Sequence, residues 1–350
     1  MGKLKKLTGY RLFLPLSCLI IVLLINLITT PTFFRITINN GVLYGYIIDV
    51  INRASELVVL AVGMTLVVSA SAGTDISVGA VMAVAAAVCT RVLAGGEVSV
   101  NEYANPYILA VLAALAVAVV CGGFNGLLVA KLKIQPMVAT LILFTAGRGI
   151  SQLVTNGQIT YIRVDGYKLL GNNIPGIPIP TPIFVAVIVV VLTYILLKKT
   201  AMGMYIQSVG INERASRLVG LKSVKIIWMA YAFCGLCAGI AGLVASSRIY
   251  SADANNIGLN MELDAIAAVA LGGNSLGGGR FSLLGSVIGA YTIQALTTTL
   301  YAMSVPSDQI PVYKAIVVIL IVAVQSEELR KLKKRMMAKH TSKTVEGGVA

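Results

Sequence analysis

Long apolar runs alternate with short polar gaps along nearly all of the 350-residue chain. About 20 consecutive apolar residues are enough to cross the hydrocarbon core of a bilayer as a helix. The pattern predicts an all-α, polytopic membrane protein with about ten transmembrane helices, some of them short or broken by glycine and serine. The predicted segments are 12–30, 47–69, 75–95, 106–130, 136–155, 181–198, 225–248, 262–275, 283–303 and 309–325.

The composition agrees with a membrane protein and indicates a single domain. Hydrophobic residues make up 57% of the chain and charged residues only 12%, whereas soluble domains carry about 25% charged residues. No polar stretch is long enough to form a separate soluble domain. We therefore predict one transmembrane domain, 12–325, between a basic N-terminal segment, 1–11, and a basic C-terminal tail, 326–350.

The formal net charge of +14 is distributed as in membrane proteins rather than as in nucleic-acid-binding proteins. Most lysines and arginines fall in gaps that the ten-segment layout assigns to one side, and the other gaps are neutral or acidic. Cytoplasmic loops of membrane proteins are enriched in these two residues. We therefore expect a protein of the bacterial cytoplasmic (inner) membrane, with both termini and the loop 199–224 in the cytoplasm, and no nucleic-acid partner.

Several kinds of chemistry are excluded by what the sequence lacks. The glycine-rich stretch 272–280 has no lysine followed by serine or threonine, the pair with which a phosphate loop holds phosphate and magnesium. The single histidine, His340, lies in the basic tail, so no histidine-based metal site or catalytic triad is possible. Cys234 and Cys237 have no second pair, which favours buried small residues. We predict no catalytic residue, no cofactor and no metal.

Polar residues inside apolar segments are the candidates for a substrate pathway. Asp75 precedes the segment 75–95, and its position favours a helix cap over substrate contact. Arg148 lies inside the segment 136–155, where an arginine requires a wet cavity, a carboxylate or carbonyl oxygens. Contact with sugar hydroxyls and a structural ion pair both remain open for it. The candidate pathway residues are Asp75, Ser77, Asn125, Arg148 and Asn274.

The longest polar gap, 199–224, predicts a short amphipathic helix. Asn212 is a good N-cap and Gly220 is a natural C-terminal stop. An apolar helix face in such a loop needs a groove, which either a partner protein or the membrane surface can supply. The apolar face consists of Ala215, Leu218 and Val219, and the polar face of Glu213, Arg214 and Arg217.

Several motifs in a fixed order resemble the ribose-type ABC permeases over roughly 45–325. They are Asp75–Gly79, Asn125–Lys131, Pro136–Leu141, Leu263–Gly273 and Ser275–Arg280. The stretches 48–54 and 252–259 look more like the galactofuranose branch of that family than the ribose branch. One departure is that Ala72 and Thr74 replace a glycine and an isoleucine that are usual in the family, so the geometry at the start of the following helix could differ.

The resemblance implies the architecture and role of an ABC importer permease. Such a subunit moves a sugar, here a galactofuranose-like hexose or a related monosaccharide, by alternating access. It implies ATP-binding cassette subunits in the cytoplasm, a periplasmic or extracellular sugar-binding protein, a second permease copy or paralogue, and the lipid bilayer as partners. By the same resemblance, the loop 203–220 corresponds to the segment with which permeases of this family dock on the ATPase. Alternatives are a secondary transporter driven by an ion gradient, a channel component, or a permease for another polyol or pentose such as ribose.

Overall fold

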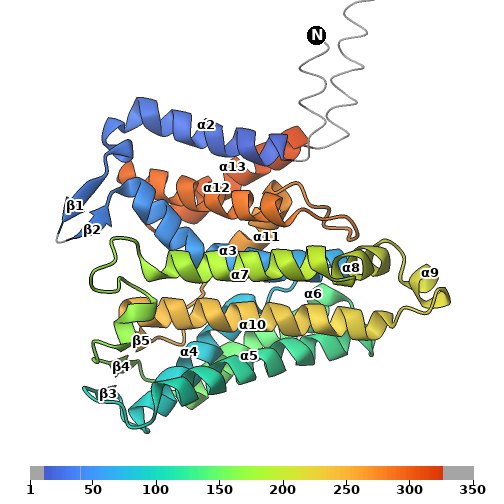
Figure 1. Cartoon of the computed structure of the whole chain (residues 1–350), viewed down its shortest axis with the longest axis horizontal. Coiled ribbons are helices and arrows are strands. Elements are labelled where there is room, and N and C mark those ends of the chain that lie inside the picture. Colours follow the sequence, from blue (N-terminus) through green and yellow to red (C-terminus); the bar gives the residue numbers. More distant parts are fainter. Residues whose placement is uncertain (1–11, 40, 326–350) are drawn as a thin grey trace, which may run out of the picture.

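The structure is a computed structural model that describes residues 12–39 and 41–325, so the predicted basic termini lie outside the described residues. The described chain is mostly helical, as expected, with small strands at one end of the bundle (Figure 1). Its α-helices are α2 (Phe13–Thr29), α3 (Tyr46–Ser71), α4 (Val78–Ala94), α5 (Tyr107–Ala130), α6 (Pro136–Val154), α7 (Thr181–Lys199), α8 (Met202–Ile211), α9 (Glu213–Leu218), α10 (Ser223–Ile249), α11 (Met261–Leu271), α12 (Leu283–Ala302) and α13 (Ile310–Gln325).

Helix α3 forms the centre of the bundle. Seventeen of its 26 residues are buried, most of them in the C-terminal two thirds of the helix, and it packs against α7, α10, α11 and α12. By contrast, α5, α6 and α7 each expose a row of large apolar side chains, including Leu112, Val120 and Leu192. Exposed apolar faces of this extent are what the hydrocarbon core of a membrane covers.

Each of the ten predicted segments contains a helix, but the number of membrane-spanning helices is not confirmed. Within the described residues six helices, α3, α5, α6, α7, α10 and α12, are long and apolar enough to cross a membrane. Helices α2, α4 and α13 are apolar but shorter. Helix α11, in the predicted segment 262–275, has only 11 residues, which is about 16 Å against a hydrocarbon core of about 30 Å.

Small residues bring α5 and α10 into close contact. A Cβ atom on Gly122 of α5 would overlap the carbonyl oxygen of Tyr231, and one on Gly235 of α10 would overlap that of Ala118. Such spacing of small residues lets helix backbones approach each other in membranes, where apolar surface alone gives no driving force. Cys234 and Cys237 are buried with free thiols on α10, as expected for structural cysteines.

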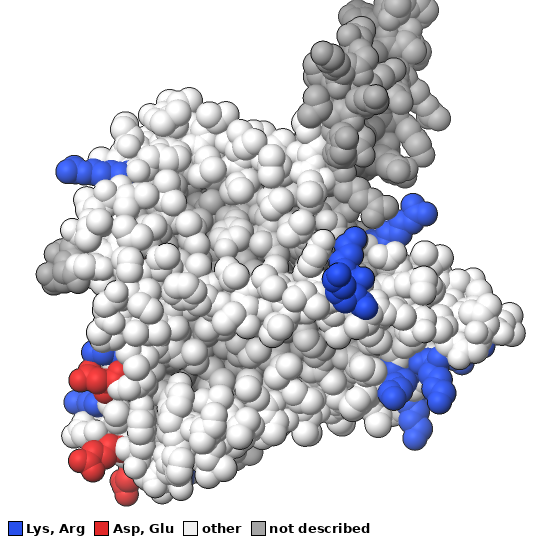
Figure 2. Space-filling model, viewed as in Figure 1, with Lys and Arg blue, Asp and Glu red and all other residues white. Residues whose placement is uncertain are grey.

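The two ends of the bundle differ. One end carries the antiparallel hairpin of β1 (Thr37–Asn39) and β2 (Val42–Tyr44). The same end carries the sheet β3–β4–β5, in which β4 (Thr160–Ile162) pairs in parallel with β3 (Ser99–Val100) and antiparallel with β5 (Ser251–Ala252). The other end carries α8 and α9 (Figure 1). Lysine and arginine side chains gather there without acidic neighbours in this view, whereas acidic side chains lie at the strand end (Figure 2).

Three loops that the sequence assigned to one side meet at the α8–α9 end. The backbone N–H of Gly279, in the loop 272–282, donates to the carbonyl oxygen of Ser69 at 3.0 Å, and a Cβ on Gly210 of α8 would overlap that same oxygen. Lys133, in the loop 131–135, forms an ion pair with Glu213 of α9. The start of α2 and the end of α13 also lie toward this end (Figure 1).

Candidate functional site

Helices α8 and α9 together form what we name the α8–α9 element, at the end of the bundle. The sequence places one short helix between 203 and 220, and the structure divides this stretch in two at Asn212, which has an extended backbone conformation. The predicted cap is present, because Asn212 Oδ1 accepts a hydrogen bond from the backbone N–H of Ala215 at 2.9 Å. Gly220 has a φ of +84°, a conformation that favours glycine and ends the helix.

The tip of the α8–α9 element is apolar and unpartnered within the described residues. The side chains of Leu218 and Val219 are 89% and 77% exposed, and Ala215 beside them is exposed as well. Helix α9 projects beyond the ends of the neighbouring long helices (Figure 1). Two large apolar side chains at this level of exposure indicate a contact surface for another chain or for lipid.

Glu213 lies on the inner side of α9, although the sequence grouped it with Arg214 and Arg217 on an outward polar face. Its carboxylate forms ion pairs with Lys133 and Arg217 and accepts a hydrogen bond from Ser223 Oγ at 3.1 Å. Burial raises the pKa of Glu213, but these donors outweigh burial and hold the pKa below its ordinary value. Arg214 is exposed, as predicted.

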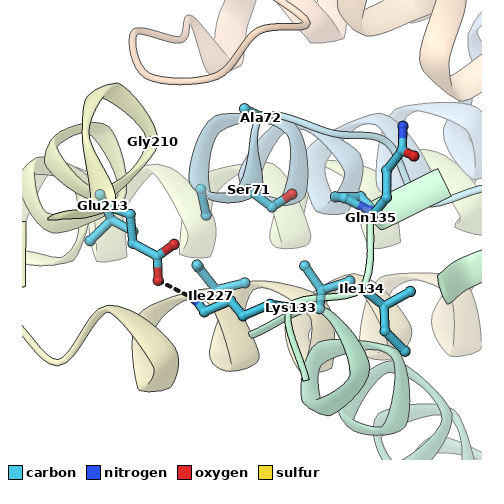
Figure 3. A pocket seen from close by; sticks show the side chains of 12 residues that line it. Ser71, Ala72, Lys133, Ile134, Gln135, Gly210, Glu213 and Ile227 are labelled. Carbon is cyan, nitrogen blue, oxygen red and sulfur yellow. Dashed lines mark hydrogen bonds and ion pairs between the residues drawn. The ribbon is translucent and has the colours of Figure 1, made fainter. Parts of the chain in front are cut away.

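A pocket of about 300 Å³ lies beneath α9 (Figure 3). It is bounded by the last turn of α3, the loop between α5 and α6, the end of α8 and the first half of α10. None of the five predicted pathway residues lines it, whereas Glu213 does. The polar side chains in its wall are Ser71, Lys133, Gln135 and Glu213.

Three of the predicted pathway residues form one buried cluster before α4, which we name the Asp75 cluster. Asp75 Oδ1 accepts hydrogen bonds from the backbone N–H and the hydroxyl of Ser77, at 2.9 and 2.7 Å. Asn125 Nδ2, from α5, donates to Ser77 Oγ at 2.8 Å, while Asn125 Oδ1 has no partner among the described residues. Asp75 thus orders the turn that leads to Ser77, the N-cap residue of α4, and does not itself cap the helix, because no side-chain capping bond is present at the start of α4.

Asn274 lies apart from this cluster, at the start of the loop 272–282. Its amide donates to the carbonyl oxygen of Val269 at 3.0 Å and to Ser286 Oγ at 2.8 Å, and its Oδ1 accepts from the N–H of Ser282 at 2.6 Å. Ser286 also bonds to Thr65 of α3 at 2.6 Å. Asn274 therefore joins the two ends of this loop to each other and to the central helix.

Arg148 binds carbonyl oxygens. Its Nη1 donates to the carbonyl oxygens of Ala254, Asn255 and Ile257, at 3.0, 3.4 and 2.5 Å. An arginine in a membrane segment requires a wet cavity, a carboxylate or carbonyl oxygens. In the structure Arg148 is bound by backbone carbonyl oxygens. These three residues belong to the non-helical stretch that precedes α11, so Arg148 fixes the position of that stretch.

Two ion pairs join helices in a way that sequence reasoning did not anticipate. Arg248 of α10 lies 3.2 Å from Glu56 of α3, and Lys314 of α13 lies 2.7 Å from Asp264 of α11. The sequence shows each of these residues as an ionisable residue within or beside an apolar segment. It does not show which residues pair, because the partners are far apart along the chain.

Comparisons with known proteins give a consistent result. The sequence profile of a family described as branched-chain amino acid transport system / permease component matches residues 46–325. The chain is 44% identical to the galactofuranose transporter permease protein YtfT of Escherichia coli, with 91% of this chain and 90% of that protein covered. No solved structure matches.

Two further relatives also match over most of their length. The fructose import permease protein FruF of Bifidobacterium longum is 38% identical, with 99% of this chain and 96% of that protein covered. The ribose import permease protein RbsC of Escherichia coli is 35% identical, with 89% and 93% covered.

Proposed function

Because this chain belongs to the permease-component family and is a transport subunit rather than an enzyme, we propose that it imports a galactofuranose-like hexose or a related monosaccharide. The observation that carries the substrate class is the near full-length similarity to permeases named for galactofuranose, fructose and ribose. The identity is 44% for the galactofuranose protein against 35% for the ribose protein, which favours the hexose over the pentose.

The partners follow from the same premise. ATP-binding cassette subunits supply the energy, a sugar-binding protein delivers the substrate, and a second permease copy or paralogue completes the path. The described residues carry no phosphate-binding loop, which is consistent with hydrolysis of ATP in a separate subunit. The exposed apolar side chains of α5, α6 and α7 fit a lipid bilayer.

The α8–α9 element is proposed as the docking site for the ATP-binding subunits. Its exposed apolar residues, Leu218 and Val219, form a face of the size that a groove in a partner accepts. The surrounding lysines and arginines support a cytoplasmic location for this end by the positive-inside rule (Figure 2). ATP binding in the partner would then move α9 and switch the two permease copies between outward-open and inward-open states.

Reconstitution tests the proposal. The permease, its cognate ATP-binding subunits and its sugar-binding protein are placed in liposomes, and uptake of labelled galactofuranose, fructose, ribose and leucine is measured with and without ATP. ATP-dependent uptake of a hexose, blocked by omission of the ATPase, supports the proposal. Uptake that instead follows a sodium or proton gradient without ATP would show a secondary transporter, and preferential uptake of leucine would overturn the sugar.

A further inference from the structure

Lys133 has an unusual backbone conformation for a lysine. It follows the C-terminus of α5 with a φ of +57°, a left-handed conformation that glycine or asparagine normally adopts after a helix. The turn is closed by hydrogen bonds from the N–H of Leu132 to the carbonyl oxygen of Leu127 and from that of Ile134 to Leu128. Glycine would adopt this backbone conformation with less strain. The presence of lysine therefore indicates a role for its side chain.

That side chain makes the ion pair with Glu213, and both residues line the pocket beneath α9 (Figure 3). Glu213 is the first residue of α9 and is held by two further donors, Arg217 and Ser223. The lysine therefore ties the loop between α5 and α6 to the base of the proposed docking helix. The pocket lies between these parts, and the ion pair joins two residues of its wall.

The chain that follows Lys133 packs against the loop that carries Asp75. Three residues further on, Pro136 begins α6, and its ring lies so close to Gly73 that a Cβ atom there would overlap it. One turn further along α6, Thr140 Oγ1 accepts a hydrogen bond from the backbone N–H of Ile76 at 3.2 Å. The start of α6 is thus packed against the loop 72–77, which carries Asp75 and leads into α4.

We propose that the Lys133–Glu213 ion pair transmits movement of α9 to the first turn of α6, and through that turn to the Asp75 cluster at the start of α4. Lys133 is a positioning residue in this scheme and touches no substrate. The inference rests on the proposed function, because it takes α9 to be the element that the ATP-binding subunits move. Ion pairs of this kind contribute little to stability when partly exposed, so the expected effect is on coupling.

Four variants of the complete reconstituted complex test it. Lys133→Gln removes the charge, and Lys131→Gln is the matched control, because Lys131 lies in the same loop and forms no ion pair among the described residues. Lys133→Arg keeps the charge. Lys133→Gly removes the side chain and relieves the left-handed backbone conformation.

The measurements are sugar transported per ATP hydrolysed, co-purification of the ATP-binding subunits, and melting temperature. For Lys133→Gln and Lys133→Gly we expect a fall of about fivefold or more in sugar per ATP, with normal co-purification. Lys133→Gly should melt at the wild-type temperature or above. Lys131→Gln should behave as wild type and Lys133→Arg should retain most coupling.

Two results would overturn the inference while leaving the proposed function intact. One is wild-type sugar per ATP in Lys133→Gly. The other is loss of co-purification in Lys133→Gln, which would make the pair a part of docking rather than of transmission. If the proposed function itself were wrong, the wild-type complex would show no ATP-dependent sugar uptake. That result is distinct from both outcomes above, which concern only the variants.

Discussion

At the scale of single residues, three of the five polar side chains expected along the pathway, Asp75, Asn274 and Arg148, bind backbone groups that lie outside the helices. Asp75 and Ser77 order the loop before α4, Asn274 closes the loop before α12, and Arg148 binds carbonyls before α11. Unpaired backbone groups are costly in a bilayer unless protein or a wet cavity satisfies them. These residues therefore permit broken helices inside the membrane domain, where a transport path requires them.

Arg148→Leu should reduce transport by loosening the stretch before α11. The substitution removes hydrogen bonds from a charged donor to the carbonyl oxygens of Ala254 and Ile257, and we expect a loss of about 2–4 kcal/mol in the free energy of unfolding. Uptake rate and thermal stability in detergent are the measurements. Arg148→Lys, which keeps the charge without the planar fork, should show a smaller loss. Wild-type kinetics in Arg148→Leu would rule out this role.

Asp75→Asn should be tolerated better than Asp75→Ala. Asparagine retains an oxygen that accepts the two hydrogen bonds from Ser77, whereas alanine leaves those donors unpaired at a cost of about 1–3 kcal/mol. Among the described residues Asp75 forms no ion pair, so loss of the charge removes no partner. Uptake and melting temperature of the two variants are compared. If asparagine is as harmful as alanine, the carboxylate charge itself is required.

At the scale of the element, α9 is short and depends on its surroundings. It has only six residues, fewer than an isolated helix needs for stability. The cap of Asn212 and the ion pairs of Glu213 hold it in place, and the apolar side chains of Leu218 and Val219 at its end stay largely exposed. A small helix that is fixed at its base and exposed at its tip is suited to bind a partner and to move with it.

Ala215→Trp should block docking of the ATP-binding subunits. Ala215 lies beside Leu218 and Val219 on the exposed face, and a large side chain there would clash with a closely fitting groove. We expect the affinity for the ATPase to fall by about a hundredfold, with uptake lost. The affinity for the sugar-binding protein should be unchanged, because that contact lies at the opposite end of the bundle.

Ala215→Ser is the size-matched control for this prediction and should assemble normally. Co-purification of the subunits, uptake and binding-protein affinity are measured for both variants. A stable Ala215→Trp protein that assembles and transports normally would show that α9 is not the docking element. Arg280 and its glycine-rich neighbours, which lie at the same end of the bundle, would then be the next candidates.

At the scale of the whole molecule, both ends of the described chain point to the same side. The start of α2 and the end of α13 lie toward the α8–α9 end (Figure 1). The predicted basic segments 1–11 and 326–350 lie outside the described residues, and their charge is part of the positive-inside pattern in the sequence. We therefore propose that this end of the bundle faces the cytoplasm.

Reporter fusions test this orientation. Fusions after Arg11 and at Lys343 should both read as cytoplasmic, because both positions lie in basic stretches of the sequence. A fusion at Glu102, next to β3 at the strand end, serves as the control and should read as periplasmic. A periplasmic signal from either terminal fusion would contradict the predicted even number of crossings.

Much of the helical architecture was predictable because it depends on local sequence. Apolar runs define the helices, and Asn212 and Gly220 bound α9 through their own backbone preferences. The segment 262–275 was harder to predict. Its apolar residues continue the membrane pattern, but only Met261–Leu271 are helical, and the chain before them is held by Arg148 from α6, a contact that hydropathy does not record.

The sequence by itself therefore determined the membrane class, the order of the helices, the family and the short capped helix at one end. Local periodicity, charge and motif spacing carry this information along the chain. Only the tertiary structure decided that Asp75, Ser77 and Asn125 form one cluster, that Glu213 faces inward, and that Lys133 joins α9 to α6. These are contacts between residues far apart in the chain, and they exist only when packing brings their helices together.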